Sequence, residues 1–216
     1  MREKLYRIFV SLGTVLILSA LFLCLYNIKQ NNDAYEISQN VLEELKKAVP
    51  EPDTAENFVY IPEVKQDDLF EPYEEQSPSE PLLTAVELDG NYYCGYISMP
   101  SLDIELPVLI NWSYENLKIA PCCYSGSPDT HNFVIIAHNY NSHFGKLKYL
   151  NSDDEIIFTS CSGESYTYTV VNTEYVNGYD FEQMFSGQQD DWDLTLFTCT
   201  LDGQSRVTVR AVQKQQ

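Results

Sequence analysis

The chain is poor in basic residues and in histidine. Its 216 residues hold 13 Lys and Arg against 32 Asp and Glu, so the formal net charge is −19. Nucleic-acid binding needs a basic face for the phosphate backbone, so this charge argues against nucleic acid as a partner. Three histidines and the lack of any CxxC pair argue against a zinc site. There is no internal repeat or low-complexity tract, and a hydrophobic fraction of 44% excludes wholesale disorder.

Charge and proline divide the chain into three parts. Residues 1–32 hold four basic residues and one acid, whereas residues 33–89 hold 16 acids, three lysines and six of the ten prolines. We therefore predict a cytoplasmic tip and transmembrane helix over 1–32, an acidic stalk over 33–89, and a globular domain over 90–216.

The first part has the length of a membrane span. Residues 8–28 contain no charged side chain, and as a helix they would be about 30 Å long, the thickness of the hydrocarbon core. A cleaved signal peptide is the alternative, but its apolar core is shorter, and Leu25-Tyr26-Asn27 is a poor cleavage site. Because the basic residues precede the span, we expect a single-pass cell-membrane protein with its N-terminus in the cytoplasm and the rest outside the cell.

The second part is predicted to be a stalk. Residues 33–49 are expected to be helical, since Asp33-x-x-Glu36 resembles a capping box and apolar residues follow at helical spacing: Ile37, Val41, Leu42, Leu45 and Ala48. Prolines and acids break regular structure from residue 50 to 81, which favours a solvated linker. The alternative is that residues 68–72 fold back over the domain.

The third part is predicted to be rich in β-strands. Pro107 places one predicted strand at an edge or bulge, and the continuous apolar run 133–137 indicates a strand buried on both faces. Seven or so strands indicate a closed or nearly closed barrel, or a sandwich. The predicted strands are 92–99, 104–110, 133–137, 155–159, 165–174, 194–199 and 206–212, with helical turns at 113–119, 144–150 and 181–185.

Six cysteines divide into three groups. Cys24 lies in the apolar N-terminal segment, and Cys199 ends a predicted strand. The others are predicted to be buried free thiols, with a disulfide among them as the alternative, because an extracellular location permits one. These four are Cys94, Cys122, Cys123 and Cys161.

Cys199, Arg206 and His138 form a candidate reactive group. Arg206 opens the strand after Cys199, and the turn-prone Asp202-Gly203 lies between them, so a hairpin would bring thiol and guanidinium together. His138 directly follows the strand 133–137, and reactive groups are often presented at strand ends. A thiol can form a thioester, an imidazole can transfer protons, and a guanidinium can donate hydrogen bonds to an oxyanion. Together they indicate acyl transfer.

These residues also carry a family resemblance. The segment Thr195-Leu196-Phe197-Thr198-Cys199 matches the TLxTC signature of sortases, the cysteine transpeptidases of Gram-positive surfaces, position for position. The segment 134–138 resembles the family's strand-then-His motif, and Arg206 stands where the family has its arginine. Residues 96–108 are similar to the usual opening of the domain, so the resemblance covers about residues 90–213.

The resemblance implies a fold and a reaction. The fold would be mainly β, a closed barrel of about eight strands with short helices, behind the transmembrane helix. The enzyme would cleave an LPxTG-like sorting signal after Thr through a thioester on Cys199, and transfer the surface protein to an amine of a cell-wall precursor or a pilin lysine. His138 would be the general acid and base, Arg206 would hold substrate and oxyanion, and Thr198 and Phe197 would line the substrate groove, with no metal or other cofactor required.

Alternatives stay open within this interpretation. His143 competes with His138 as the base, and Arg210, four residues along the same strand face, competes with Arg206. A calcium site is the alternative to a solvated acidic loop, with Asp190, Asp191, Asp193 and Glu105 as its ligands. The sequence assigns no sortase class. Alternative functions are an extracellular cysteine peptidase that uses water, and a non-catalytic anchored binding domain.

Overall fold

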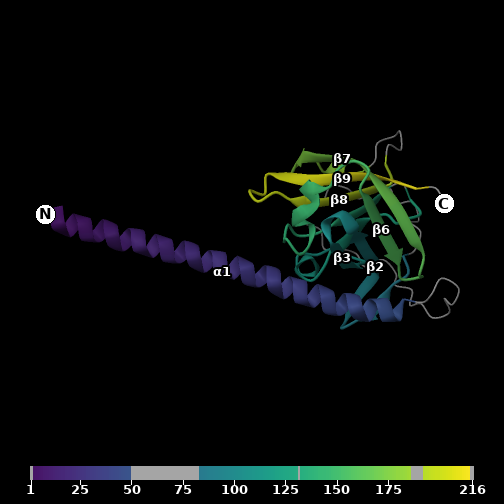
Figure 1. Ribbon diagram of the computed structural model, residues 1–216, viewed down its shortest axis with the longest axis horizontal. Helices are drawn as coiled ribbons and strands as arrows, with labels where there is room; N and C mark the ends of the chain where they lie inside the picture. Colours follow the sequence, from purple (N-terminus) through teal and green to yellow (C-terminus); the bar gives the residue numbers. More distant parts are fainter. Residues whose placement is uncertain (1, 50–82, 131, 186–191, 215–216) are drawn as a thin grey trace.

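A computed structural model describes residues 2–49, 83–130, 132–185 and 192–214 (Figure 1). One helix, α1 (Arg2–Ala48), contains both the predicted span and the predicted helix that follows it. Its N-terminal part projects away from the barrel, and its C-terminal part lies along it (Figure 1). Among the described residues, the segment Tyr6–Ala48 of α1 is the one helix long and apolar enough to cross a membrane, with a mean hydropathy of 2.6 in its most apolar window.

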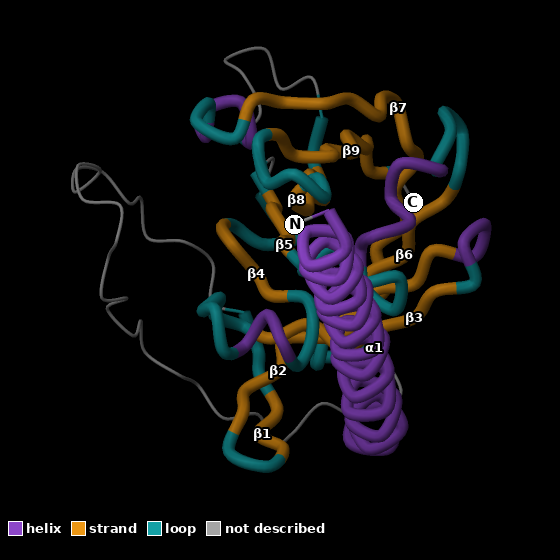
Figure 2. Tube along the Cα trace, turned by 90° about the vertical axis from the view of Figure 1, so that its left-hand side faces the viewer, coloured by secondary structure: helices purple, strands orange, loops and turns teal. Residues whose placement is uncertain are grey.

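Eight strands close into a barrel. The hydrogen-bonded order is β1-β2-β3-β4-β5-β8-β9-β7-β6, and β6 pairs back with β2, so β2 to β9 form the barrel while β1 pairs with β2 outside it (Figure 2). This confirms the predicted closed barrel of about eight strands. The strands are β1 (Val86–Leu88), β2 (Asn91–Met99), β3 (Ile104–Leu109), β4 (Cys122–Ser125), β5 (Phe133–Ile136), β6 (Glu155–Ser160), β7 (Ser165–Asn177), β8 (Leu194–Cys199) and β9 (Ser205–Gln213).

Side chains alternate between the barrel interior and its outer surface. Leu194 and Leu196 of β8 are buried in the apolar core with Val209 of β9, because successive residues of a strand point to opposite faces. The helical turns predicted between strands are 3-10 helices: η2 (Asn116–Lys118), η3 (Phe144–Tyr149) and η4 (Phe181–Met184), with a further one, η1 (Pro100–Leu102), after β2.

The pairing of β2 with β6, the seam that closes the barrel, requires a glycine. Gly95 of β2 pairs with Ser160 of β6, and a Cβ at this position would lie 2.2 Å from the Thr159 carbonyl oxygen. No side chain fits at that separation, so the close approach of the two strands depends on Gly95.

The helix 33–48 is part of the globular unit and is not a free stalk. Val41 and Leu45 pack in an apolar cluster with Leu117, and the Ser38 hydroxyl donates a hydrogen bond to the Ile119 carbonyl at 2.6 Å.

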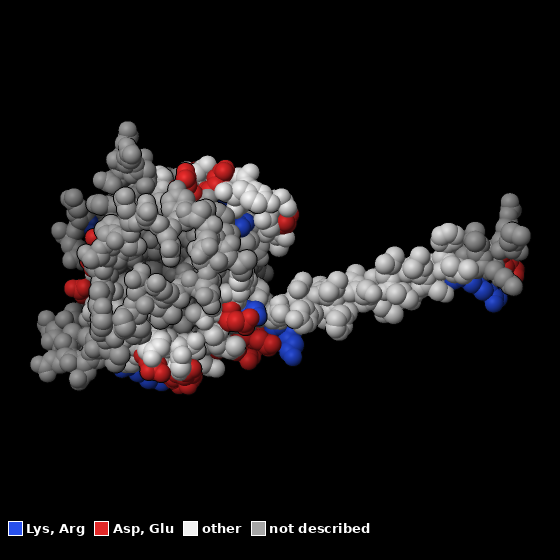
Figure 3. All heavy atoms as spheres, turned by 180° about the vertical axis from the view of Figure 1, so that it is seen from behind, with Lys and Arg blue, Asp and Glu red and all other residues white. Residues whose placement is uncertain are grey.

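The projecting part of α1 shows a long stretch without charged side chains (Figure 3). Since β1 pairs with β2, the sheet begins before the predicted boundary at residue 90. The predicted linker and the fold-back segment 68–72 lie outside the described residues.

Candidate active site

The strand that ends at Cys199 lies beside the strand that leads to His138. β5 and β8 are parallel neighbours, with Ile136 opposite Phe197, so both strands end at the same end of the barrel. The segment after β5 stays attached to β8, because the Asn139 amide donates a hydrogen bond to the Cys199 carbonyl at 2.9 Å. The histidine loop and the cysteine strand are therefore held together by backbone pairing and this bond.

Arg206 lies directly across the hairpin from Cys199. The two residues are Cα partners in the antiparallel β8–β9 pair, as the short turn between them led us to expect. The guanidinium Nη1 donates to the carbonyls of Gly203 at 3.2 Å and Ser205 at 3.1 Å. A Cβ on Gly178 would lie 3.0 Å from this nitrogen, so the β7–η4 turn lies close against the arginine side chain.

Cys199 is the exposed thiol of the barrel. The described structure shows all six cysteines unbonded, with Cys199 and Cys24 exposed and the other four buried. Burial raises the pKa of the Cys94, Cys122 and Cys161 thiols, which disfavours the nucleophilic thiolate at those positions.

His138 is half-buried at the mouth of β5. Burial lowers its pKa, and the nearby Lys118 ammonium lowers it further. Its ring lies against Tyr140, with ring centroids 4.9 Å apart. The imidazole is therefore predominantly neutral at pH 7, the form that can accept a proton.

His143, the alternative candidate for the base, lies in a different environment from His138. Its side chain is 0% exposed, and Nε2 lies 3.1 Å from the Ser38 hydroxyl of α1. Burial, followed by the proximity of His138, lowers its pKa to about 4. This ring is enclosed between α1 and the barrel, which makes it a poor candidate for contact with a peptide.

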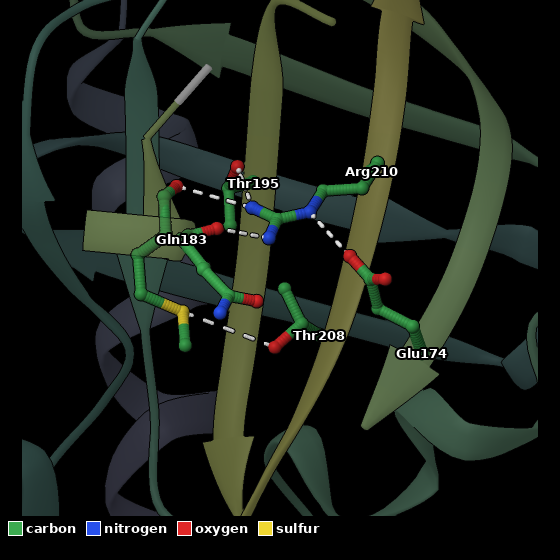
Figure 4. A network of polar contacts seen from close by, with 6 residues as sticks. Glu174, Gln183, Thr195, Thr208 and Arg210 are labelled. Carbon is green, nitrogen blue, oxygen red and sulfur yellow. Dashed lines mark hydrogen bonds and ion pairs between the residues drawn. The ribbon is translucent and has the colours of Figure 1, made fainter. Parts of the chain in front are cut away.

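Arg210 is a structural residue of the barrel wall. Its side chain is 3% exposed and pairs with Glu174 through a 3.0 Å contact between Nε and Oε1. It also donates to the Thr195 hydroxyl and to the carbonyls of Gln183 and Met184 (Figure 4). These contacts hold η4 against β8 and β9 and occupy the Arg210 guanidinium. Arg206 is therefore the better candidate for contact with a substrate.

The two predicted groove residues lie on opposite faces of β8. Phe197 is on the outer face with Cys199 and is 1% exposed, because it packs under Tyr124 with ring centroids 5.5 Å apart. Thr198 points the other way, is 2% exposed, and donates its hydroxyl to the Ala137 carbonyl at 2.8 Å. Strand alternation turns Thr198 inward, where it joins β8 to the histidine segment, so Phe197 is the one of these two residues that shares the face of Cys199.

An aromatic ridge over Phe197, two residues before Cys199 on the same strand face, was not foreseen from the sequence. Tyr124 lies on β4, a strand of four residues that carries no alternating pattern long enough to recognise. Its ring lies 5.7 Å from that of Trp112 and 6.2 Å from that of Phe185, between ring centroids. These three partly exposed rings cover the buried Phe197 and form an apolar surface suited to an extended peptide.

The acidic residues considered for calcium do not converge among the described residues. Asp193 accepts a hydrogen bond from the Gln213 amide at 2.6 Å, and Glu105 pairs with Lys46 at 2.6 Å. Asp190 and Asp191 lie outside the described residues. Within the part of the chain that is described, no group of three or more His, Cys, Asp or Glu residues is placed to hold a metal ion.

The barrel, with a strand-end thiol, a histidine and an arginine gathered at one end, has the features of a thiol-dependent acyl-transfer protein. The family model described as "Sortase domain" matches residues 97–214, so the chain belongs to the sortase family of cysteine transpeptidases. A comparison with curated proteins finds no match.

Solved sortases share the fold. Sortase A from Corynebacterium diphtheriae is 25% identical with a TM-score of 0.52, and the match covers 58% of this chain and 62% of that one. Sortase C1 from Streptococcus agalactiae is 25% identical with a TM-score of 0.52, covering 60% and 72%. Sortase C from Clostridium perfringens SM101 is 23% identical with a TM-score of 0.50, covering 57% and 71%. These matches include structures titled sortase A and sortase C alike, so they assign no class to this chain.

Proposed function

We propose that this sortase is a membrane-anchored transpeptidase with Cys199 as nucleophile, His138 as general acid and base, and Arg206 as hydrogen-bond donor to the substrate. The observation that carries the proposal is the meeting of parallel β5 and β8 at one end of the barrel, with Arg206 across the hairpin from Cys199. The exposure of Cys199, set against the burial of the other barrel thiols, supports the same assignment.

The proposed reaction begins with a proton transfer. The neutral His138 takes the proton of the Cys199 thiol, the thiolate attacks a peptide carbonyl carbon, and the resulting oxyanion accepts hydrogen bonds from Arg206. A guanidinium has five N–H donors and only Nη1 bonds to the hairpin carbonyls, so capacity remains for a substrate oxygen. The intermediate collapses to a thioester as His138, now protonated, gives its proton to the leaving amine. The incoming amine then loses a proton to His138 and expels the thiolate.

The proposed acyl donor is a surface protein with an LPxTG-like sorting signal, cleaved after Thr. The aromatic ridge of Trp112, Tyr124 and Phe185, which covers Phe197 two residues before Cys199, supports a peptide with apolar side chains. The Clostridium perfringens sortase C has been solved with the C-terminal cell wall sorting motif, which motivates this peptide class for the first test. The amine acceptor is proposed to be a cell-wall precursor or a pilin lysine.

The proposed location is the cell membrane, with a single span and a cytoplasmic N-terminus. Residues 8–28 carry no charge, and the apolar window of α1 is unburied in the structure. An exposed apolar helix of this length is stable only where lipid covers it.

The test uses the full chain in nanodiscs with LPxTG-like peptides of varied sequence. Hydroxylamine or a diaminopimelate-type amine serves as acceptor, and mass spectrometry identifies the products. We expect an amine adduct, and loss of at least about a thousandfold in its rate for Cys199→Ala and for His138→Ala. Arg206→Ala should lower the rate as well, whereas Cys24→Ala is the matched cysteine control and should leave it unchanged.

Each of the other possible results would refute the assignment of Cys199 or favour one of the two alternative functions. Cleavage that gives only the free acid, even with excess amine, would favour a peptidase that uses water. Activity that survives Cys199→Ala would refute the proposed nucleophile. Failure to trap a thioester on Cys199 with any peptide of the set would favour the non-catalytic binding domain.

A further inference from the structure

The helix α1 continues without a break from the proposed membrane span to the part that packs against the barrel. No glycine or proline occurs between Gly13 and Pro50, and α1 remains helical throughout Arg2–Ala48. Asn31 lies three residues beyond Ile28, about 4.5 Å along the helix axis, and already touches the barrel. The Ser142 hydroxyl donates to the Asn31 carbonyl at 3.2 Å, and the Ser142 amide donates to the Asn31 side chain at 3.2 Å. Barrel contact therefore begins where the apolar segment ends.

A second attachment fixes the direction of the barrel. Lys46 pairs with Glu105 at 2.6 Å, fifteen residues and roughly 22 Å along the helix from Asn31. The Gln39 amide donates to the Glu105 carbonyl at 3.1 Å between these points. Contacts spread over this length prevent the barrel from pivoting about α1, so the orientation of the helix in a membrane also sets the orientation of the barrel.

The end of the barrel that carries Cys199 faces the N-terminal part of α1. The loop after His138 makes the connection, since Asn139 bonds to Cys199 and Ser142 bonds to Asn31. The hairpin between β8 and β9 points along the helix toward its N-terminal end (Figure 1), and the view from that side looks onto this end of the barrel (Figure 2).

Two neighbouring loops at this end present large apolar side chains to solvent. Leu201 in the β8–β9 hairpin is 93% exposed, and Tyr179 in the β7–η4 turn is 85% exposed. The Gly178 amide donates to the Gln204 carbonyl at 2.9 Å, so the loops are joined. We call Leu201 and Tyr179 the rim. Asp202 and Asp180 flank them, which favours a shallow position among headgroups over insertion into the acyl chains.

We propose that the rim rests in the headgroup region of the bilayer that α1 spans. The inference depends on the anchoring proposed above. Cys199, two residues before Leu201, then acts at the membrane surface, on peptide segments held within reach of the bilayer. The exposed leucine and tyrosine contribute affinity for the interface, and the rigid helix supplies the orientation.

Tryptophan fluorescence in nanodiscs tests the proposal. The full chain is reconstituted with and without lipids brominated near the headgroup, and the fluorescence added by each new tryptophan is compared with that of the parent chain. Leu201→Trp and Tyr179→Trp probe the rim. Val212→Trp is the matched control, because Val212 is also an exposed apolar residue, 37% exposed, at the opposite end of β9. Phe22→Trp reports on the anchor.

We expect brominated lipid to remove most of the added fluorescence of the Phe22, Leu201 and Tyr179 variants, and little of that of the Val212 variant. If Phe22→Trp is quenched but both rim variants are quenched no more than Val212→Trp, the rim contact is refuted and the anchor stands. An unquenched Phe22→Trp would overturn the anchoring and the rim contact with it. Equal quenching at Val212 and the rim would show that the barrel lies on its side, which also contradicts the proposal.

Discussion

Replacement of Arg210 by methionine should destabilise the barrel without involving the chemistry directly. The guanidinium is almost fully buried and bonds to four groups: Glu174 at 3.0 Å, the Thr195 hydroxyl at 3.0 Å, the Met184 carbonyl at 3.1 Å, and the Gln183 carbonyl. It also lies 4.4 Å from the centre of the Trp192 ring. Methionine has a similar length but satisfies none of these acceptors.

The expected cost follows from what the substitution leaves behind. Removing one partner of a buried ion pair costs about 3–5 kcal/mol when the remaining charge stays buried. The Glu174 side chain is 40% exposed and can be hydrated, so we lower that figure. Most of the remaining loss of stability comes from carbonyl and hydroxyl acceptors that are left with fewer donors. We therefore expect Arg210→Met to lower the free energy of unfolding by about 2–4 kcal/mol.

Thermal and urea unfolding of the full chain in detergent micelles measures this cost. At about 2–4 °C per kcal/mol, the expected fall in Tm is roughly 5–15 °C. Arg206→Met is the matched control on the same strand face, and it should cost at most about 1 kcal/mol because Arg206 bonds to two hairpin carbonyls near the surface, one exposed and one partly buried. The reasoning is refuted if Arg210→Met unfolds within about 0.5 kcal/mol of the parent, a margin ordinary for surface substitutions, or if Arg206→Met is equally destabilising.

Three further expectations concern the pH response, the barrel seam and the helix contact. Because the folded pKa of His143 is lowered to about 4, the unfolded chain binds more protons between about pH 6.5 and 4, and stability falls as pH falls through that window by up to about 3 kcal/mol. Urea midpoints at pH 7 and 4.5 should show this fall in the parent, and His143→Gln should flatten it; an unchanged slope would mean that another group is responsible. Gly95→Ala would place a Cβ 2.2 Å from the Thr159 carbonyl and should cost at least about 3 kcal/mol or prevent folding, whereas Gly13→Ala, with open space around it, should be neutral; folded, stable Gly95→Ala protein would contradict the seam argument. Ser38→Ala removes a hydroxyl that bonds to both Ile119 and His143 and should cost about 2 kcal/mol in urea unfolding, and a cost no greater than that of the exposed control Glu44→Ala would show that the helix contact contributes little.

The strands and the candidate site were largely predictable from short-range patterns. The apolar run before His138 and the run ending in Cys199 are local signals, and each corresponds to an observed strand, β5 and β8. The turn residues between Cys199 and Arg206 were sufficient to predict their pairing, because a tight hairpin determines its own register. The uncharged length of residues 8–28 likewise predicted an apolar helix without reference to the rest of the chain.

Other features depended on contacts between distant segments. The short strand β4 was missed because four residues carry too little periodicity, so Tyr124 and the aromatic ridge went unrecognised. Thr198 and Phe197 were both assigned to the groove, although strand alternation places their side chains on opposite faces.

The residue pattern alone determined most of the strands, the position of the apolar helix, and the small set of thiol, imidazole and guanidinium groups at the ends of those strands, since each of these depends on neighbouring residues. Only the tertiary structure distinguishes the similar candidates within this set by their surroundings. His138 and His143 are five residues apart, and Arg206 and Arg210 are four apart on one strand face, yet one of each pair lies near Cys199 and the other is buried against α1 or η4. Burial and hydrogen-bond partners distinguish them, and those depend on which distant segments pack together.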